Sequence, residues 1–158
     1  MYPTINFYIN GEFTSGNATK HQSIINPATL ENLGQLPIAT TRDLDHALQS
    51  AQTAFESWRH SSPMERSKIL RKVAQLCRDR AEEIGRHITL DQGKPLAESV
   101  GEVKSCADHA DWHAEECRRI YGRVIPPRDP RVRQIVVKEP IGVCAAFTPW
   151  NFPFNQAI

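Results

Sequence analysis

The sequence has little cysteine, no long apolar run and no excess of charge of either sign. Its four cysteines, at positions 77, 106, 117 and 144, form neither a C-x-x-C pair nor a small disulfide framework. The longest apolar stretch, residues 141–147, is far shorter than the roughly 20 residues needed to cross a bilayer. With 19 basic and 18 acidic residues, the net charge of +1 argues against nucleic acid or a membrane surface as the main partner.

The amino-terminal stretch MYPTINFYIN also lacks the features of a secretory signal peptide. It contains neither a basic region nor an apolar core of the required length. Together with the isolated cysteines, this pattern favours a reducing compartment, so we expect a cytoplasmic protein with free thiols. The 158 residues are 40% hydrophobic and 23% charged, which is the composition of a folded chain rather than a disordered one.

Turn signals near the amino terminus predict extended structure. Asn10-Gly11 is a preferred pair for a type I′ turn, and strand-forming residues flank it on both sides, so a hairpin is predicted. A further turn at residues 26–29 precedes a short extended piece over residues 33–38.

Helix-start signals and apolar periodicity predict a block of helices in the middle of the chain. Thr40 followed by Asp43 resembles a capping box, and Ser62-Pro63 followed by Glu65 is a stronger one. The second helical pattern continues to Leu90, and we expect a break near Asp79 because one uninterrupted helix would be unusually long.

The next signals predict one more helix, a loop and two strands. Gly93 is a good residue to end a helix, and Pro95 can open the following one, which we expect to end near Tyr121-Gly122. A proline-rich loop over residues 125–130 then precedes a predicted strand over 131–138. Residues 141–147 are apolar at successive positions, which is typical of a strand buried on both faces of a parallel sheet.

The closing motif TPWNFP follows that last predicted strand. A helix is predicted to begin near Pro153, and ligands of open α/β sheets bind at the carboxyl ends of the strands. The amide of Asn151 would then point into the crevice, where an N–H donor can stabilise an oxyanion. The alternative is an ordinary strand–turn–helix joint in which Trp150 is core and Asn151 caps a helix. A parallel strand needs neighbours and none follows, so we expect an incomplete chain.

Five ordered pieces of the sequence resemble the amino-terminal portion of the aldehyde dehydrogenase superfamily. They are YINGEF, INPAT, LDQGKPLAE at residues 90–98, KEPIGV and TPWNFP. LDQGKPLAE and the loop IYGRVIPP most resemble the succinate-semialdehyde dehydrogenase branch. The resemblance implies an α/β fold comprising an N-terminal hairpin, a helical block, an oligomerisation strand and the first strand of a Rossmann-like parallel sheet.

The resemblance also implies roles for individual residues. Asn151 matches the family asparagine whose amide holds the oxyanion of the thiohemiacetal intermediate. Residues Thr148, Pro149, Trp150 and Asn151 match the segment along the nicotinamide and ribose of NAD or NADP. Phe152 and Gln156 match positions that line the substrate pocket. The implied substrate is a small-molecule aldehyde, which includes the semialdehydes.

The rest of the family's machinery is not in these residues. Residues 1–158 match the amino-terminal part of the NAD(P)-binding domain, and residues 120–140 match part of the oligomerisation arm, which implies a homodimer or homotetramer. The nucleophilic cysteine, the general-base glutamate and the glycine-rich turn lie further along in family members, so the catalytic domain is absent. We expect a fragment that is inactive alone; a truncated non-catalytic product or interaction module is the alternative.

None of the four cysteines is predicted to replace the missing nucleophile. A catalytic thiolate needs a lowered pKa and partial exposure. Cys77 and Cys117 lie on apolar helical faces, and Cys144 lies inside the predicted buried strand. Cys106 has polar neighbours but no motif around it.

One cluster raises metal binding as a rival interpretation. Cys106, His109, His113 and Cys117 lie along one side of a predicted helix and are zinc-ligand types. Over their 11 residues a helix rises about 16 Å, so one tetrahedral ion cannot reach both ends. His109 and His113 alone could share a metal, but a solvated polar face is the favoured interpretation, and we predict no metal site.

Overall fold

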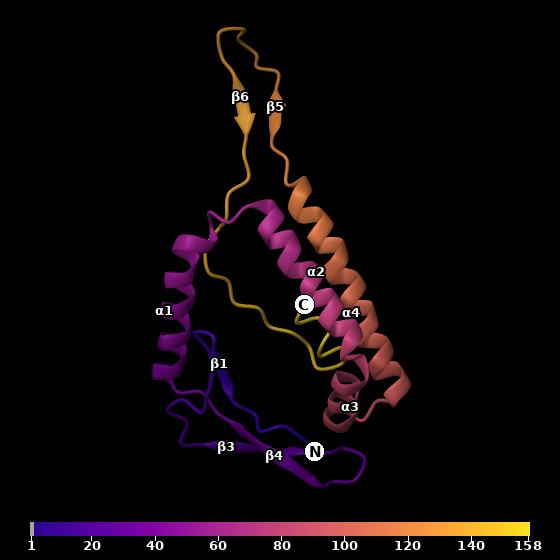
Figure 1. Cartoon of the computed structure of the whole chain (residues 1–158). Coiled ribbons are helices and arrows are strands. Elements are labelled where there is room, and N and C mark those ends of the chain that lie inside the picture. Colours follow the sequence, from indigo (N-terminus) through magenta and orange to yellow (C-terminus); the bar gives the residue numbers. More distant parts are fainter. Residues whose placement is uncertain (1) are drawn as a thin grey trace.

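The computed structural model describes residues 2–158 as three two-stranded sheets and a group of helices (Figure 1). Helices α2, α3 and α4 pack together on one side, and α1 stands apart beside the amino-terminal strands. In chain order the elements are β1 (Phe7–Ile9), β2 (Glu12–Thr14), β3 (His21–Ile25), β4 (Asn32–Pro37), α1 (Thr41–Trp58), α2 (Pro63–Asp79), α3 (Ala81–Gln92), α4 (Leu96–Glu116), the 3-10 turn η1 (Cys117–Arg119), β5 (Arg123–Ile125) and β6 (Gln134–Val136).

The predicted amino-terminal hairpin is confirmed. Strands β1 and β2 pair antiparallel, and both turn residues, Asn10 and Gly11, have the positive φ that a type I′ turn requires (55° and 81°). The predicted extended piece is confirmed as β4, which pairs antiparallel with β3 and contains a register shift between Ile24 and Ile25.

The first helix begins as predicted, with an additional tie to the hairpin. Thr40 Oγ1 accepts a hydrogen bond from the Asp43 backbone, and Asp43 Oδ2 accepts one from Thr40 N, at 3.3 Å and 2.9 Å. The buried Asp43 carboxylate also accepts from Asn17 N at 2.8 Å and from Asn17 Nδ2 at 2.9 Å. The Thr40 backbone N–H, followed by Asn17, holds the pKa of Asp43 well below its usual range. One carboxylate therefore fixes both the helix start and the loop after β2.

The boundaries of α2 and α3 also follow the local signals, whereas α4 ends at Glu116 and is followed by η1, so the end predicted near Tyr121-Gly122 is wrong. Ser62 and Glu65 form a complete capping box at the start of α2. The predicted break near Asp79 is confirmed, because α2 ends there and α3 begins at Ala81. Gly93 ends α3 in the left-handed conformation, at φ 82°, with its N–H donated to the Thr89 carbonyl at 2.9 Å.

The core lies where α4 packs between α2 and α3. It is built mostly of small side chains, which let the helices approach closely: Ala74, Cys77, Ala81, Ile88, Val103, Ala107 and Ala110. Cys106, on α4, is fully buried, and its Sγ lies 3.9 Å from the Phe154 carbonyl oxygen. Burial raises the pKa of its thiol to about 11, which makes it a poor nucleophile.

The close contact of α3 with α4 yields the first prediction. A Cβ on Gly85 would lie 2.7 Å from Val100 Cγ2 and 3.0 Å from Val100 N, whereas a Cβ on Gly101 would meet nothing within 4 Å. We expect Gly85→Ala to lower the free energy of unfolding by about 1–3 kcal/mol. Gly101→Ala, the matched control in α4, should raise it by about 0.5–1 kcal/mol because alanine favours helix. Urea denaturation measures both; equal stabilisation by the two changes would contradict the helix contact.

The chain between residues 120 and 140 forms a hairpin that projects from the body (Figure 1). Strand β6 confirms part of the strand predicted over residues 131–138, and it pairs antiparallel with β5. The pairing corrects one prediction, because Ile125 was placed in a loop and belongs to β5. Both strands are largely exposed.

The buried strand predicted over residues 141–147 is wrong. They form no strand, and Ile141 and Phe147 are 92% and 95% exposed. Cys144 is likewise exposed rather than inside a buried strand. The physical reason is that no strand within residues 2–158 pairs with this segment, and an extended chain without a partner cannot bury its backbone groups.

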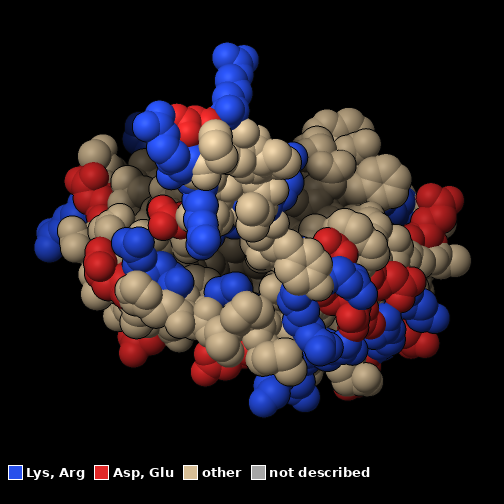
Figure 2. All heavy atoms as spheres, turned by 90° about the horizontal axis from the view of Figure 1, so that it is seen from above, with Lys and Arg blue, Asp and Glu red and all other residues tan. Residues whose placement is uncertain are grey.

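Charges are interspersed on the face shown in Figure 2. Arg78 on α2 pairs with Asp108 and Asp111 on α4, at 2.7 Å and 2.8 Å, and Arg71 pairs with Glu115 in the same way. The basic residues of α2 are therefore partly neutralised by α4. None of the helices within the described residues is long and apolar enough to cross a membrane.

Candidate functional site

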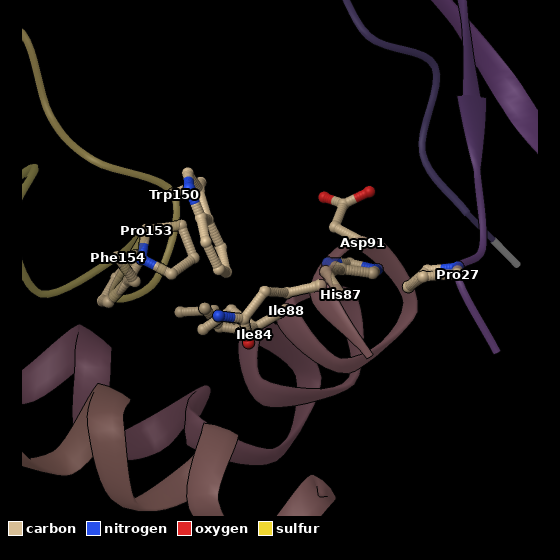
Figure 3. A pocket seen from close by; sticks show the side chains of 9 residues that line it. Pro27, Ile84, His87, Ile88, Asp91, Trp150, Pro153 and Phe154 are labelled. Atoms are coloured by element: carbon tan, nitrogen blue, oxygen red, sulfur yellow. The ribbon is translucent and has the colours of Figure 1, made fainter. Parts of the chain in front are cut away.

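The closing segment returns to the corner where α3 meets α4. Trp150, Pro153 and Phe154 face Ile84 and Ile88 of α3 across an open cavity of about 500 Å³ (Figure 3). His87, Asp91 and Pro27 lie on the other side of that cavity. Phe154 of this segment packs against the core that α2, α3 and α4 form.

Two side chains, one from the last residue of α3 and one from the connection to α4, bind the backbone carbonyl of Asn151. Gln92 Nε2 donates to it at 2.9 Å, and Lys94 Nζ donates at 3.0 Å. The same ammonium group lies 4.5 Å from the centre of the Phe152 ring, which is cation–π distance. The loop that ends α3 therefore holds the TPWNFP turn through its main chain.

Glu102 on α4 binds the other side of the same turn. Its Oε2 pairs with Lys94 Nζ at 2.6 Å, and its Oε1 accepts from the backbone N–H groups of Phe154 and Asn155, at 2.9 Å and 3.1 Å. Burial opposes the charged form of Glu102, but the Lys94 bond and the two backbone donors outweigh it and hold its pKa below the ordinary value. The carboxylate thus binds three donors, the Lys94 ammonium group and the two backbone N–H groups.

The side chain of Asn151 is left uncommitted by this arrangement. The backbone carbonyl of Asn151 is bound by Gln92 and Lys94, but the side-chain amide has no hydrogen-bond partner within the described part of the chain. The residue is exposed. Asn151 and Phe152 line a second open cavity of about 480 Å³ together with Lys94 and Glu102. The geometry offers an amide donor on an anchored backbone, which is what an oxyanion-binding group requires.

The other predicted site residues are only partly brought together. Trp150 lines the first cavity and is 78% exposed, so the alternative in which it is a core residue is wrong. Thr148 and Pro149 are exposed and line neither cavity. Gln156 N donates to the Phe152 carbonyl at 3.1 Å, but residues 151–157 form only bends and turns, so the helix predicted near Pro153 is wrong. Gln156 lines neither cavity.

Sequence reasoning missed Gln92, Lys94 and Glu102 as site residues. Gln92 and Lys94 lie within LDQGKPLAE, a piece to which the sequence analysis assigned no site role. The available signal was Glu102 itself, because it lies at helical spacing with buried Ser99 and Cys106 on the inner stripe of α4. A charged residue in such a stripe needs a partner, and Lys94 precedes it by eight residues.

One histidine of α4, His109, contacts the closing turn. His109 Nδ1 lies 2.7 Å from Asn155 Oδ1, which adds a further tie between α4 and the closing turn. Over residues 2–158, no group of three or more His, Cys, Asp or Glu side chains is arranged to hold a metal ion.

Comparisons with known proteins assign the class. The model of the aldehyde dehydrogenase family matches residues 13–158. Glutarate-semialdehyde dehydrogenase of Pseudomonas putida is 43% identical over 92% of this chain and 30% of its own length. The NADP(+) succinate-semialdehyde dehydrogenase GabD of Escherichia coli is 42% identical over the same shares.

Solved structures agree with the sequence comparison. An NADP-dependent enzyme of E. coli superposes with a TM-score of 0.93 at 40% identity, covering 98% of this chain and 32% of that one. Betaine aldehyde dehydrogenase of Staphylococcus aureus, in complex with NAD+, superposes at 0.90 and 32% identity, covering 96% and 31%. The chain belongs to the aldehyde dehydrogenase family. It spans about a third of the length of the relatives it matches.

Proposed function

We propose that this chain is the amino-terminal part of an NAD(P)-dependent aldehyde dehydrogenase that oxidises an aldehyde to the carboxylic acid. The nucleophilic cysteine that forms the thiohemiacetal would lie outside these 158 residues. The single observation that carries the proposal is the anchored turn, which fixes the backbone of Asn151 and leaves its amide exposed. Below, the complete enzyme means the longer protein that this proposal implies.

The mechanistic role of these residues is electrostatic. As an aldehyde carbonyl is attacked, negative charge develops on its oxygen, and a fixed N–H donor stabilises that charge most strongly in the transition state. The Asn151 amide would supply this donor. Phe152 and Gln156 would line the aldehyde pocket, of which Phe152 already lines the cavity beside Asn151.

The exposed segment Thr148–Asn151 would contact the nicotinamide and ribose of NAD or NADP. The residues present fit that role in one respect, because the side chains of this segment are exposed and Asn151 lines an open cavity. The dinucleotide, when bound, would accept a hydride. The similar proteins include examples with each cofactor: GabD is named as an NADP(+) enzyme, and the S. aureus structure is a complex with NAD+.

A semialdehyde substrate, a cytoplasmic location and an oligomeric state complete the proposal. Glutarate- and succinate-semialdehyde dehydrogenases support the substrate class. The projecting β5–β6 hairpin supports assembly as a homodimer or homotetramer, because a two-stranded sheet is marginal in water without further partners. Its exposed Val124 and Ile135 would be covered by such a neighbour.

We expect the 158-residue chain by itself to form no NADH or NADPH with any aldehyde. The thiolate nucleophile is not supplied by Cys77 or Cys106, which are buried with pKa values raised by desolvation. Cofactor absorbance at 340 nm measures this, and mock-purified host extract is the control. Turnover by the pure chain would contradict the prediction.

The test of the proposed function begins with the intact mass of the purified protein. A protein longer than 158 residues is then assayed with a panel of aldehydes, semialdehydes included, and with both cofactors. Oxidation of at least one of them supports the proposal. A protein that ends at residue 158 supports the non-catalytic alternative, a truncated product or interaction module.

A further inference from the structure

The contact between Lys94 and Glu102 differs from the other ion pairs of the described chain in its burial. Their side chains are 12% and 1% exposed, whereas both partners of every other pair are at least 37% exposed. A buried pair contributes little net stability by itself, because desolvation of both charges offsets their attraction. Its position therefore suggests a role in fixing one local geometry.

The pair joins three separate parts of the chain. Lys94 lies in the connection after α3, Glu102 lies in α4, and both bind the turn at residues 151–155. Lys94 donates to the Asn151 carbonyl, while Glu102 accepts from the N–H groups of Phe154 and Asn155. The turn is thus held from its carbonyl side and its amide side by two groups that also bind each other.

We infer that Lys94 and Glu102 are positioning residues that orient Asn151 for oxyanion binding, a role that rests on the proposed function. The pair makes its hydrogen bonds to the main chain of the turn, Lys94 Nζ also lies 4.5 Å from the centre of the Phe152 ring, and the Asn151 amide is left free. A backbone fixed at both ends of the segment restricts the directions in which that amide can point. Such preorganisation is what makes a donor effective in a transition state.

Gln92 and His109 support the turn but cannot replace the pair. Gln92 donates to the Asn151 carbonyl, and its own Oε1 is buried without a partner among residues 2–158. His109 reaches only the side chain of Asn155. Neither group binds the N–H groups of Phe154 and Asn155, which point to the Glu102 carboxylate.

The test uses the double variant Lys94→Met/Glu102→Gln, which removes both charges at once. This double variant leaves no unpaired buried charge, and glutamine can still accept from the two backbone N–H groups, so the fold is retained. The Asn151 carbonyl loses the lysine donor, and the carboxylate acceptor becomes a weaker neutral one. Arg80→Gln/Glu83→Gln is the matched control, because it neutralises an exposed pair at the α2–α3 junction.

Hydrogen–deuterium exchange of the peptide that contains residues 150–156 is the first measurement, and it does not depend on activity. We expect the amides of Phe154 and Asn155 to exchange about fivefold to tenfold faster in the double variant, and at the wild-type rate in the control. The complete protein is used, or the 158-residue chain if no longer protein exists. An unchanged rate in the double variant would overturn the inference.

Steady-state kinetics of the complete enzyme is the second measurement. We expect kcat to fall by about 10- to 100-fold in the double variant, because a displaced donor loses much of its effect. The KM for the cofactor should change by less than about threefold. In an Asn151→Ala background the double variant should lower kcat by less than about threefold more, because the pair acts through Asn151.

The outcomes separate the inference from the proposed function. Faster exchange with unchanged kcat, or an undiminished loss of kcat in the Asn151→Ala background, would overturn the positioning role. A wild-type protein that oxidises no aldehyde would sink the proposed function and the oxyanion role with it. The exchange result would then still show whether the pair holds the turn.

Discussion

In the complete enzyme, Asn151→Ala is expected to lower kcat by about 100- to 1,000-fold, the effect of removing one oxyanion donor. The reason is that the amide interacts with charge that develops only as the aldehyde carbonyl is attacked. The KM for NAD(P) should change little, because the neighbouring residues 148–150 remain. Asn151 is exposed and its amide has no partner within residues 2–158, so the substitution should leave the melting temperature nearly unchanged.

One further variant sharpens this prediction. Asn151→Gln keeps the amide but moves it by one methylene, so its kcat should fall between wild type and the alanine variant. Steady-state kinetics with a saturating cofactor and circular dichroism melts provide the measurements. If kcat of Asn151→Ala equals that of wild type, Asn151 has no part in oxyanion binding, whatever the activity of the enzyme.

The features that the sequence predicted correctly depend on neighbours along the chain. A capping box needs only two residues three apart, and Thr40 with Asp43, like Ser62 with Glu65, has them. The left-handed end of α3 needs only Gly93. Local chemistry decides these elements, so the pattern of residues suffices.

The features that were missed depend on partners far away in the chain. An apolar run such as residues 141–147 predicts a strand, but a strand forms only when another strand pairs with it. The pattern predicts Asp43 as part of a cap, yet two of the four hydrogen bonds that its carboxylate accepts come from Asn17, 26 residues earlier. Periodicity shows which face of a helix is buried and does not show what that face meets.

The candidate site illustrates the same limit at single residues. Asn151 was identified through the motif TPWNFP, because the motif is contiguous. The groups that hold it, Lys94 and Glu102, lie 57 and more than 40 residues away, and only the fold brings them to the turn. Supporting residues of a site are therefore harder to predict from sequence than the residue that touches the ligand.

The energetics of this pair lead to the prediction with the largest effect on stability. Lys94→Met is expected to lower the free energy of unfolding by about 3–5 kcal/mol at neutral pH, because it leaves the Glu102 carboxylate buried without its counter-charge. Lys104→Met, the same change on an exposed position of α4, is the control and should alter stability by less than about 0.5 kcal/mol. Adding Glu102→Gln to Lys94→Met should restore most of the loss.

The pH dependence of this loss follows from the direction of the Glu102 pKa. In the wild type that pKa is lowered, so the stability it contributes is present above about pH 4.3, the unfolded value, and is lost as pH falls below it. In Lys94→Met the counter-charge is gone and only the backbone N–H groups of Phe154 and Asn155 oppose the effect of burial, so the pKa is higher than in the wild type and acid relieves the penalty by protonating the carboxyl. Urea denaturation from pH 7 to pH 4 should therefore show the two free energies converge. A difference that stays constant over this range would mean that the lost stability comes from packing of the lysine stem rather than from the buried charge.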